Sequence, residues 1–280
     1  MSGQVYSVLN NFGSVNAQRN AVFAGNRLGR NLGHLSSGTR ITNAGDDAAG
    51  LMIANGLRAD YTALSQATRN ANDGLGITQI ADGALSNMGN MLNRATTLAT
   101  QSASETIGDS ERETINTEYQ EIMKEINRVI DTTHFKGEQL FSQNGPVNKS
   151  LFVGDTHMES SIDLSIGGIN GSGTEAMGLE GTSISTVDNA KQALSLLKNA
   201  VGEVSKWRGT IGAQSNRLEN SISIIQVQSQ NLLAAESTIR DTNMASEIGK
   251  FTSNKILLES SMATIAQANA SSSLILSLFK

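Results

Sequence analysis

The C-terminal segment carries a regular hydrophobic pattern that reaches almost to the last residue. Positions 248, 251, 255, 258, 262, 265, 269, 272, 276 and 279 alternate steps of three and four, the spacing of one helix face. Most of these positions are apolar: Ile248, Phe251, Leu258, Met262, Ile265, Leu276 and Phe279. The first residues carry a matching stripe at Val5, Val8, Phe12 and Val15. Because chain ends normally fray, these stripes predict two terminal helices that need a packing partner.

Three more apolar stripes at helical spacing lie between the two ends. The first runs along residues 81–98, and the second follows a capping-box sequence at Ser110 to Glu113. The second stripe consists of Ile115, Tyr119, Ile122, Ile126 and Val129. The third and longest includes Leu197, Val201, Val204, Ile211 and Leu218 and continues to Ile239. A helix of about fifty residues is a rod of roughly 75 Å, so we expect these helices to pack on each other.

The period of the pattern changes in the middle of the chain. Ile162, Leu164 and Ile166 alternate with polar residues, which predicts a half-buried strand. Residues 151–153 can supply its partner. We therefore expect a small β-hairpin region at about 143–184, between the two helical arms.

These patterns together predict a mainly α fold, with long antiparallel helices in a coiled-coil-like rod bundle. A polar stretch at 35–47 interrupts the N-terminal arm, and Asp46 or Asp47 can cap the helix that follows. We expect residues 1–43 and 244–280 to form a terminal-helix domain, and residues 44–243 to form the rod domain.

Three glycines of the N-terminal helix, Gly25, Gly29 and Gly33, fall on one helical face. One interpretation is a groove that lets a neighbouring helix approach closely. The other is a deliberately weak helix, since each glycine costs about 1 kcal/mol relative to alanine. Both interpretations remain open, and both can hold at once.

Composition narrows the functional classes. The net charge is −5, and no cluster of five or more basic residues is present, so we expect no nucleic-acid partner. No run approaches 18 apolar residues, so we expect no membrane span. The N-terminus lacks the basic and apolar regions of a cleaved signal peptide. The chain has no cysteine, and this absence is equally compatible with a cytoplasmic protein and with one that is exported unfolded.

No catalytic constellation emerges from the sequence. Residues 45–50 have the outline of a phosphate loop, but Leu51 and Met52 stand where the essential lysine should be. Asp46 and Asp47 are sequence neighbours, which do not face each other on a helix. The three histidines, at 34, 134 and 157, have no metal-site spacing. We therefore expect neither an enzyme nor a cofactor.

Several blocks of the sequence resemble the bacterial flagellins. The clearest is residues 35–51, LSSGTRITNAGDDAAGL, and it is followed by QATRNANDG at 66–74. IGAQSNRL at 211–218 and NLLAAESTIRD at 231–241 agree with it. The likeness covers about 1–142 and 185–280. The large outer domains of many family members have no counterpart here, so the chain resembles a flagellin of minimal type.

The resemblance implies a secreted structural subunit that polymerises into the flagellar filament used for motility. It implies export of the unfolded chain through a type III channel, followed by folding on assembly. The terminal helices would then form an inner coiled coil in the filament. An export chaperone, junction proteins and a cap protein are the partners that the family implies. The filament would be extracellular, or periplasmic in a spirochaete.

The resemblance also identifies a segment, 92–99, by which many flagellins engage the vertebrate Toll-like flagellin receptor. The chain keeps Arg94 and Leu98, and Glu118 is the third candidate contact. Thr96 and Thr97 replace the usual Arg and Glu, so activation of the receptor stays an open question.

Two alternative functions share parts of this pattern. A hook–filament junction protein has similar ends but usually departs from the DDAAG and RNANDG blocks. An intracellular helical-hairpin protein for signalling or tethering would also contain helices with apolar stripes, but its function would not require apolar residues at the chain ends.

Overall fold

The computed structural model describes residues 11–141, 147–154, 160–166 and 173–278. The chain forms two compact units. Residues 1–58 and 232–280 make up the terminal unit, and residues 59–231 make up the rod unit. The sequence placed domain boundaries at 43/44 and 243/244 instead. The division given by the sequence stays a prediction.

Long helices dominate the structure, which confirms the expected mainly α class. The helices are α1 (Phe12–Ser37), α2 (Ala48–Ser102), α3 (Asp109–Thr132), the short α4 (Gly173–Ala176), α5 (Val187–Arg240) and α6 (Met244–Leu278). The sole proline, Pro146, lies outside all of them. With this helix breaker absent, α2 and α5 run uninterrupted for 55 and 54 residues.

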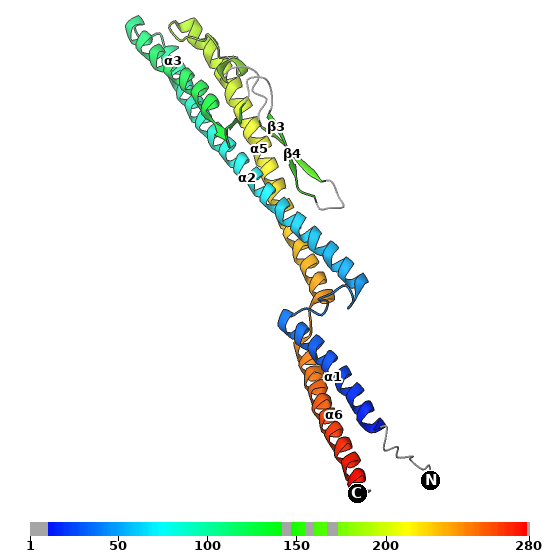
Figure 1. The fold of residues 1–280 in the computed structure, drawn as a ribbon. Coiled ribbons are helices and arrows are strands. Elements are labelled where there is room, and N and C mark those ends of the chain that lie inside the picture. Colours follow the sequence, from blue (N-terminus) through cyan, green and yellow to red (C-terminus); the bar gives the residue numbers. More distant parts are fainter. Residues whose placement is uncertain (1–10, 142–146, 155–159, 167–172, 279–280) are drawn as a thin grey trace. The chain divides into compact units, whose positions relative to one another are not determined.

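The core of the rod unit lies between α2, α3 and α5, which run side by side in Figure 1. Each helix contributes one stripe at helical spacing. Of the predicted rod-core residues, the buried ones are Tyr119, Ile126, Leu197, Val204, Ile211 and Leu218. Ile115, Ile122 and Val201 are half-buried and pack against the edge of this core.

The centre of the α3 stripe lies slightly to one side of the position read from the sequence. Met123 and Ile130 are buried beside Tyr119 and Ile126, whereas Ile122 lies at the rim. Both sets have helical spacing, so periodicity alone could not choose between them.

The turn between α2 and α3 is held by a buried arginine that the sequence patterns did not reveal. The Arg112 guanidinium donates to the carbonyl oxygens of Ser102 and Ile107. The first contact satisfies a backbone acceptor at the end of α2, where no intrahelical donor exists, and the second satisfies an acceptor in the turn itself. The N-cap of α3 is Gly108, whose N–H donates to the Glu111 carboxylate at 2.8 Å. The predicted capping-box residue Ser110 lies inside the helix instead of at its N-cap.

A β-hairpin packs against the helices of the rod unit, as expected. Strand β3 (Val147–Phe152) pairs antiparallel with β4 (Ser161–Ile166), with Leu151 opposite Ile162. The alternating Ile162, Leu164 and Ile166 are buried. Gly74 of α2 leaves room for this packing, because a methyl group there would overlap Leu151. A second, very short pair joins β1 (His134–Phe135) to β2 (Glu138–Gln139) and was not expected.

Truncation of the rod core should lower the stability of the monomer. Ile126 is fully buried between the three helices, so Ile126→Ala should cost about 2–5 kcal/mol of unfolding free energy. Thermal unfolding followed by circular dichroism measures this effect. The control is Ile80→Ala on the exposed side of α2, which should change stability by about 0.5 kcal/mol or less. Equal effects of the two substitutions would contradict the proposed position of the core.

Candidate assembly surface

The terminal unit is built on the antiparallel pair of α1 and α6, which lie side by side in Figure 1. Asn11 caps α1 by accepting from the Ser14 N–H at 3.0 Å. Its amide nitrogen donates to the Ala268 carbonyl and to the Ser272 hydroxyl, each at 3.0 Å. Gly38 ends α1 in the left-handed conformation, with φ of 70°. The cap of α1 therefore also attaches it to α6.

The seam between the two helices is made mostly of small residues. On α1 the buried residues are Ala17, Ala21, Ala24 and Asn31. On α6 the less exposed positions follow one another in steps of three and four: Glu247, Phe251, Asn254, Leu258, Ser261, Ile265, Ala268 and Ser272. Alanines let the helix backbones approach but bury little apolar area per residue. The two helices are therefore close together, but the apolar area buried between them is small.

The structure divides the predicted terminal stripes between two faces. Phe251, Leu258 and Ile265 face α1, whereas Ile248 and Met262 are 53% and 59% exposed. On α1, Phe12 and Val15 are 66% and 54% exposed and take no part in the seam. Val5, Val8 and Phe279 lie outside the described residues, as does the side chain of Leu276. Periodicity located each stripe but not the face that α1 and α6 bury against each other.

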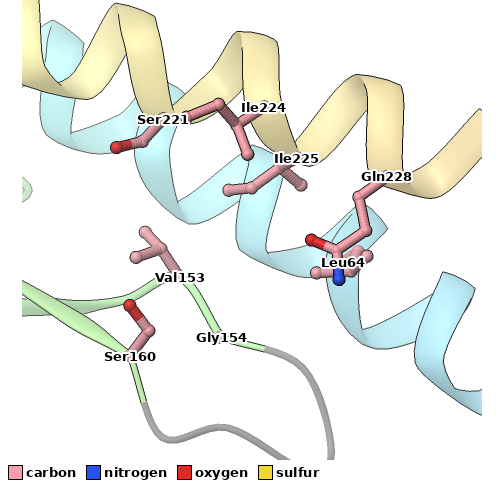
Figure 2. A pocket seen from close by; sticks show the side chains of 8 residues that line it. All are labelled: Leu64, Val153, Gly154, Ser160, Ser221, Ile224, Ile225 and Gln228. Atoms are coloured by element: carbon pink, nitrogen blue, oxygen red, sulfur yellow. The ribbon is translucent and has the colours of Figure 1, made fainter.

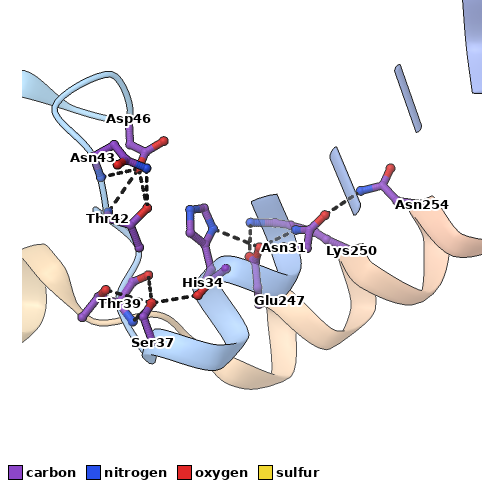
Figure 3. Close-up of polar contacts among 11 residues, drawn as sticks. Asn31, His34, Ser37, Thr39, Thr42, Asn43, Asp46, Glu247, Lys250 and Asn254 are labelled. Carbon is purple, nitrogen blue, oxygen red and sulfur yellow. Dashed lines mark hydrogen bonds and ion pairs between the residues drawn. The ribbon is translucent and has the colours of Figure 1, made fainter. Parts of the chain in front are cut away.

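One end of the seam contains a cluster of buried polar side chains (Figure 3). Glu247 is only 4% exposed, and its carboxylate accepts from the Asn31 amide. It also contacts the His34 Nδ1 at 3.2 Å and the Lys250 Nζ at 3.1 Å. The Asn31 side-chain oxygen Oδ1 accepts from the Asn254 side-chain amide at 2.8 Å. The cluster satisfies groups that would otherwise be costly to bury.

Opposing effects act on the pKa of Glu247. Burial raises this pKa, but hydrogen bonds from Asn31, Lys250 and His34 lower it further, and the net pKa lies below the usual range. The ionised carboxylate is therefore the form that the α1–α6 pair stabilises.

The connections at 38–47 and 241–243 are joined to each other next to this cluster. Thr39 and Asp241 form an isolated antiparallel bridge. The Arg40 N–H donates to the Arg240 carbonyl at 2.6 Å, and the Thr242 N–H donates to the Gly38 carbonyl at 2.9 Å. These backbone bonds align the end of α1 with the start of α6.

The two aspartates of the first connection have separate local roles. Asp47 accepts from the Gly50 N–H at 2.9 Å, which confirms the expected helix cap. Asp46 folds the loop by accepting from Thr42 and Asn43, as Figure 3 shows. The bond from the Asn43 N–H, together with those from Thr42, lowers the pKa of Asp46. The two carboxylates therefore accept hydrogen bonds from different parts of the connection.

The rod unit has one apolar hollow of note, beside the hairpin (Figure 2). Its volume is about 280 Å³, and its walls come from α2, α5 and the hairpin: Leu64, Val153, Gly154, Ser160, Ser221, Ile224, Ile225 and Gln228. None of these side chains titrates near neutral pH. The hollow therefore offers van der Waals contact but no acid–base chemistry.

Other functional classes find no support in the described part of the chain. Among the described residues, no group of three or more His, Asp or Glu side chains could hold a metal ion. No described helix has a segment that is long and apolar enough to cross a membrane. The apolar faces of α1 and α6 are the strongest functional feature.

Both helical arms match a known protein family. Residues 8–145 match the bacterial flagellin N-terminal helical region, and residues 194–279 match the bacterial flagellin C-terminal helical region. The chain belongs to the bacterial flagellins. This result confirms the resemblance seen in the sequence blocks.

Similar proteins cover nearly the whole chain of this flagellin. A flagellin of Halalkalibacterium halodurans is 37% identical over 96% of this chain and 98% of its own. A flagellar filament 30.7 kDa core protein of Treponema maltophilum is 34% identical over the same shares. The crystal structure of Bacillus cereus flagellin shares the fold, with a TM-score of 0.50 and 24% identity over 60% of this chain and 94% of that chain. These relatives favour a filament structural subunit over the two alternative functions.

The three candidate receptor contacts of this flagellin lie on α2 and α3. Arg94 donates twice to Glu118, at 2.8 and 2.6 Å, and so links the two helices. Leu98 is buried in the rod core. Contact of this segment with a receptor stays a prediction.

Acid should weaken the α1–α6 pair through Glu247. Because its pKa is lowered by folding, the ionised group contributes stability above the unfolded value near 4.3. That stability disappears as the pH falls through the lower folded pKa. Protection of the α1 and α6 amides against hydrogen exchange, corrected for the intrinsic pH dependence of exchange, should therefore decrease below about pH 5 in assembled protein. Glu247→Gln should flatten this dependence, whereas Glu105→Gln, at an exposed position of the rod unit, should preserve it. An unchanged profile in Glu247→Gln would contradict the role of this carboxylate.

The three glycines of α1 should accept alanine without a clash inside the subunit. Nothing lies within 4 Å of a methyl group added at Gly25, Gly29 or Gly33, so they do not provide close packing against α6. The triple alanine variant should gain about 1 kcal/mol of helix stability per site, seen as higher helicity of the monomer by circular dichroism. Unchanged helicity would leave only the interpretation of a groove for another helix.

Proposed function

We propose that this flagellin polymerises into the flagellar filament through the outward faces of α1 and α6. The observation that carries the proposal is the set of large apolar side chains that these helices leave exposed. They are Phe12, Val15, Val22, Phe23 and Leu32 on α1, and Met244, Ile248, Ile256, Leu257 and Met262 on α6. Large exposed apolar surfaces mark sites of protein association. In a family of filament subunits, other copies of the same chain are the natural partner.

We infer that the terminal helices fold only when they assemble. Ordering each residue costs roughly 1–2 kcal/mol of backbone entropy. The helices α1 and α6 have 26 and 35 residues to order, and the seam between them buries mainly alanines and a few larger side chains. The free energy gained from this burial is therefore small compared with the entropy lost. Burial against neighbouring copies would supply the missing stabilisation. The rod unit, with its larger core, would fold before assembly.

Export in an unfolded state agrees with terminal helices that are weakly stable before assembly. A cysteine-free chain with weakly stable ends forms no covalent cross-link that would obstruct passage through a narrow channel. We propose secretion through the flagellar type III channel, with an export chaperone, junction proteins and a cap protein as further partners. The filament would lie outside the cell, or in the periplasm of a spirochaete. The role is mechanical and non-enzymatic.

Removal of residues 248–280 should separate monomer folding from assembly. The truncated chain should remain a soluble, partly helical monomer, because the rod core does not use these residues. It should form no filaments, measured by sedimentation and electron microscopy.

A matched pair of point variants sharpens this experiment. Ile265→Ala should leave the monomer melting temperature nearly unchanged and raise the concentration required for polymerisation, whereas Ile126→Ala should lower the melting temperature. Filaments from the truncated chain would overturn the proposed function. Equal monomer destabilisation by Ile265→Ala and Ile126→Ala would show that the terminal helices are already folded in the monomer.

A further inference from the structure

The helix α1 has an unusual charge balance. It contains Arg19, Arg27 and Arg30 but no aspartate or glutamate. All three arginines are exposed. Within the described residues, none of the three forms an ion pair, whereas the polar groups at the end of the seam are well partnered.

Arg19 lies at the centre of an exposed apolar patch. Val15 precedes it by one helical turn, and Val22 and Phe23 follow it by one turn, so all four share a face. The three apolar side chains are each more than half exposed. This face is turned away from α6, which contacts the buried Ala17, Ala21 and Ala24 instead.

Glu259 occupies the equivalent place on α6. It lies between Ile256 and Met262, three residues to either side, and both of these are more than half exposed. The only other acidic residue of α6, Glu247, is already buried and paired. Among the described residues, Glu259 has no ion-pair partner in the subunit.

Each patch combines exposed apolar side chains with a central charge, which is positive at Arg19 and negative at Glu259. Lys255 lies one helical turn before Glu259, at the edge of the α6 patch. If either patch packed against an uncharged apolar surface, its central charge would lose water without gaining a partner. If the patches packed against each other, their apolar side chains would be covered and the two charges would form an ion pair. Opposite charges at the centres of the two patches would also favour this pair of surfaces over others and fix how the two helices are aligned.

We propose that Arg19 of one copy pairs with Glu259 of a second copy when α1 packs against α6 between subunits. This inference rests on the proposed assembly through the terminal helices. The surrounding Val15, Val22 and Phe23 then pack against Ile256 and Met262 of the second copy. The ion pair fixes which patches meet, while the apolar side chains supply most of the contact.

A charge-reversal experiment tests this pairing in the full-length chain. Arg19→Glu and Glu259→Arg should each raise the critical concentration for polymerisation by about tenfold or more, because like charges would meet at the contact. The swapped variant with both substitutions should polymerise within about threefold of the unmodified chain. Thermal unfolding of the rod unit should be the same in all variants.

The matched control is Arg27→Glu. Arg27 is exposed and forms no ion pair among the described residues of the same helix, and it lies eight residues, or about two helical turns, beyond Arg19. This reversal should change the critical concentration much less than Arg19→Glu. Higher salt should also reduce the penalty of the single reversals, since like-charge repulsion is screened.

The possible results distinguish this inference from the proposed function. Polymerisation of both single variants at the unmodified concentration would overturn the pairing and leave the proposed function intact. A swapped variant no better than the poorer single variant would also overturn it. Loss of assembly in Arg19→Glu but not in Glu259→Arg would assign Arg19 to a different acidic group. Absence of filaments from the unmodified chain would overturn the proposed function and this inference with it.

Discussion

The organisation of this flagellin depends on how much of each helix's apolar surface its own chain can cover. In the rod unit, α2, α3 and α5 bury their stripes against one another, and the hairpin covers more of the surface. In the terminal unit, α1 and α6 pack against each other (Figure 1). One shared seam leaves large apolar side chains on the remaining faces of both helices. These remaining faces are the surfaces through which we propose that copies of the chain associate.

The terminal seam combines weak apolar packing with specific polar contacts. Alanines at 17, 21 and 24 bring α1 close to α6 without burying much area. Polar groups act at both ends, with Asn11 at one end and the Glu247 cluster at the other. Such contacts depend on alignment, since a shift would leave a buried carboxylate or amide unsatisfied. This combination suits a helix pair that must be correctly aligned but need not be stable alone.

The sequence block that resembles flagellins most clearly builds the junction between the helices. Gly38 ends α1, Thr39 bridges to Asp241, and Asp47 caps α2. A side chain at Gly50 would overlap Asp47 and Ile41, so glycine is required by close approach. The residues whose spacing resembles a phosphate loop or an acidic pair thus cap a helix and shape the connection before it. Their distinctive spacing matches the geometry of this folded connection.

The sequence by itself determined the helices, the hairpin and the positions of most rod-core residues. These features follow from local periodicity, which records which side of an element is apolar. Only the tertiary structure decided that α6 turns Phe251, Leu258 and Ile265 towards α1 and leaves Ile248 and Met262 exposed. When apolar residues extend around much of a helix, several of its faces could be buried. Which face is buried depends on the helix that packs against it. The polar cluster was equally hidden, because Asn31 and Glu247 are separated by 216 residues and become neighbours only when α1 and α6 pair.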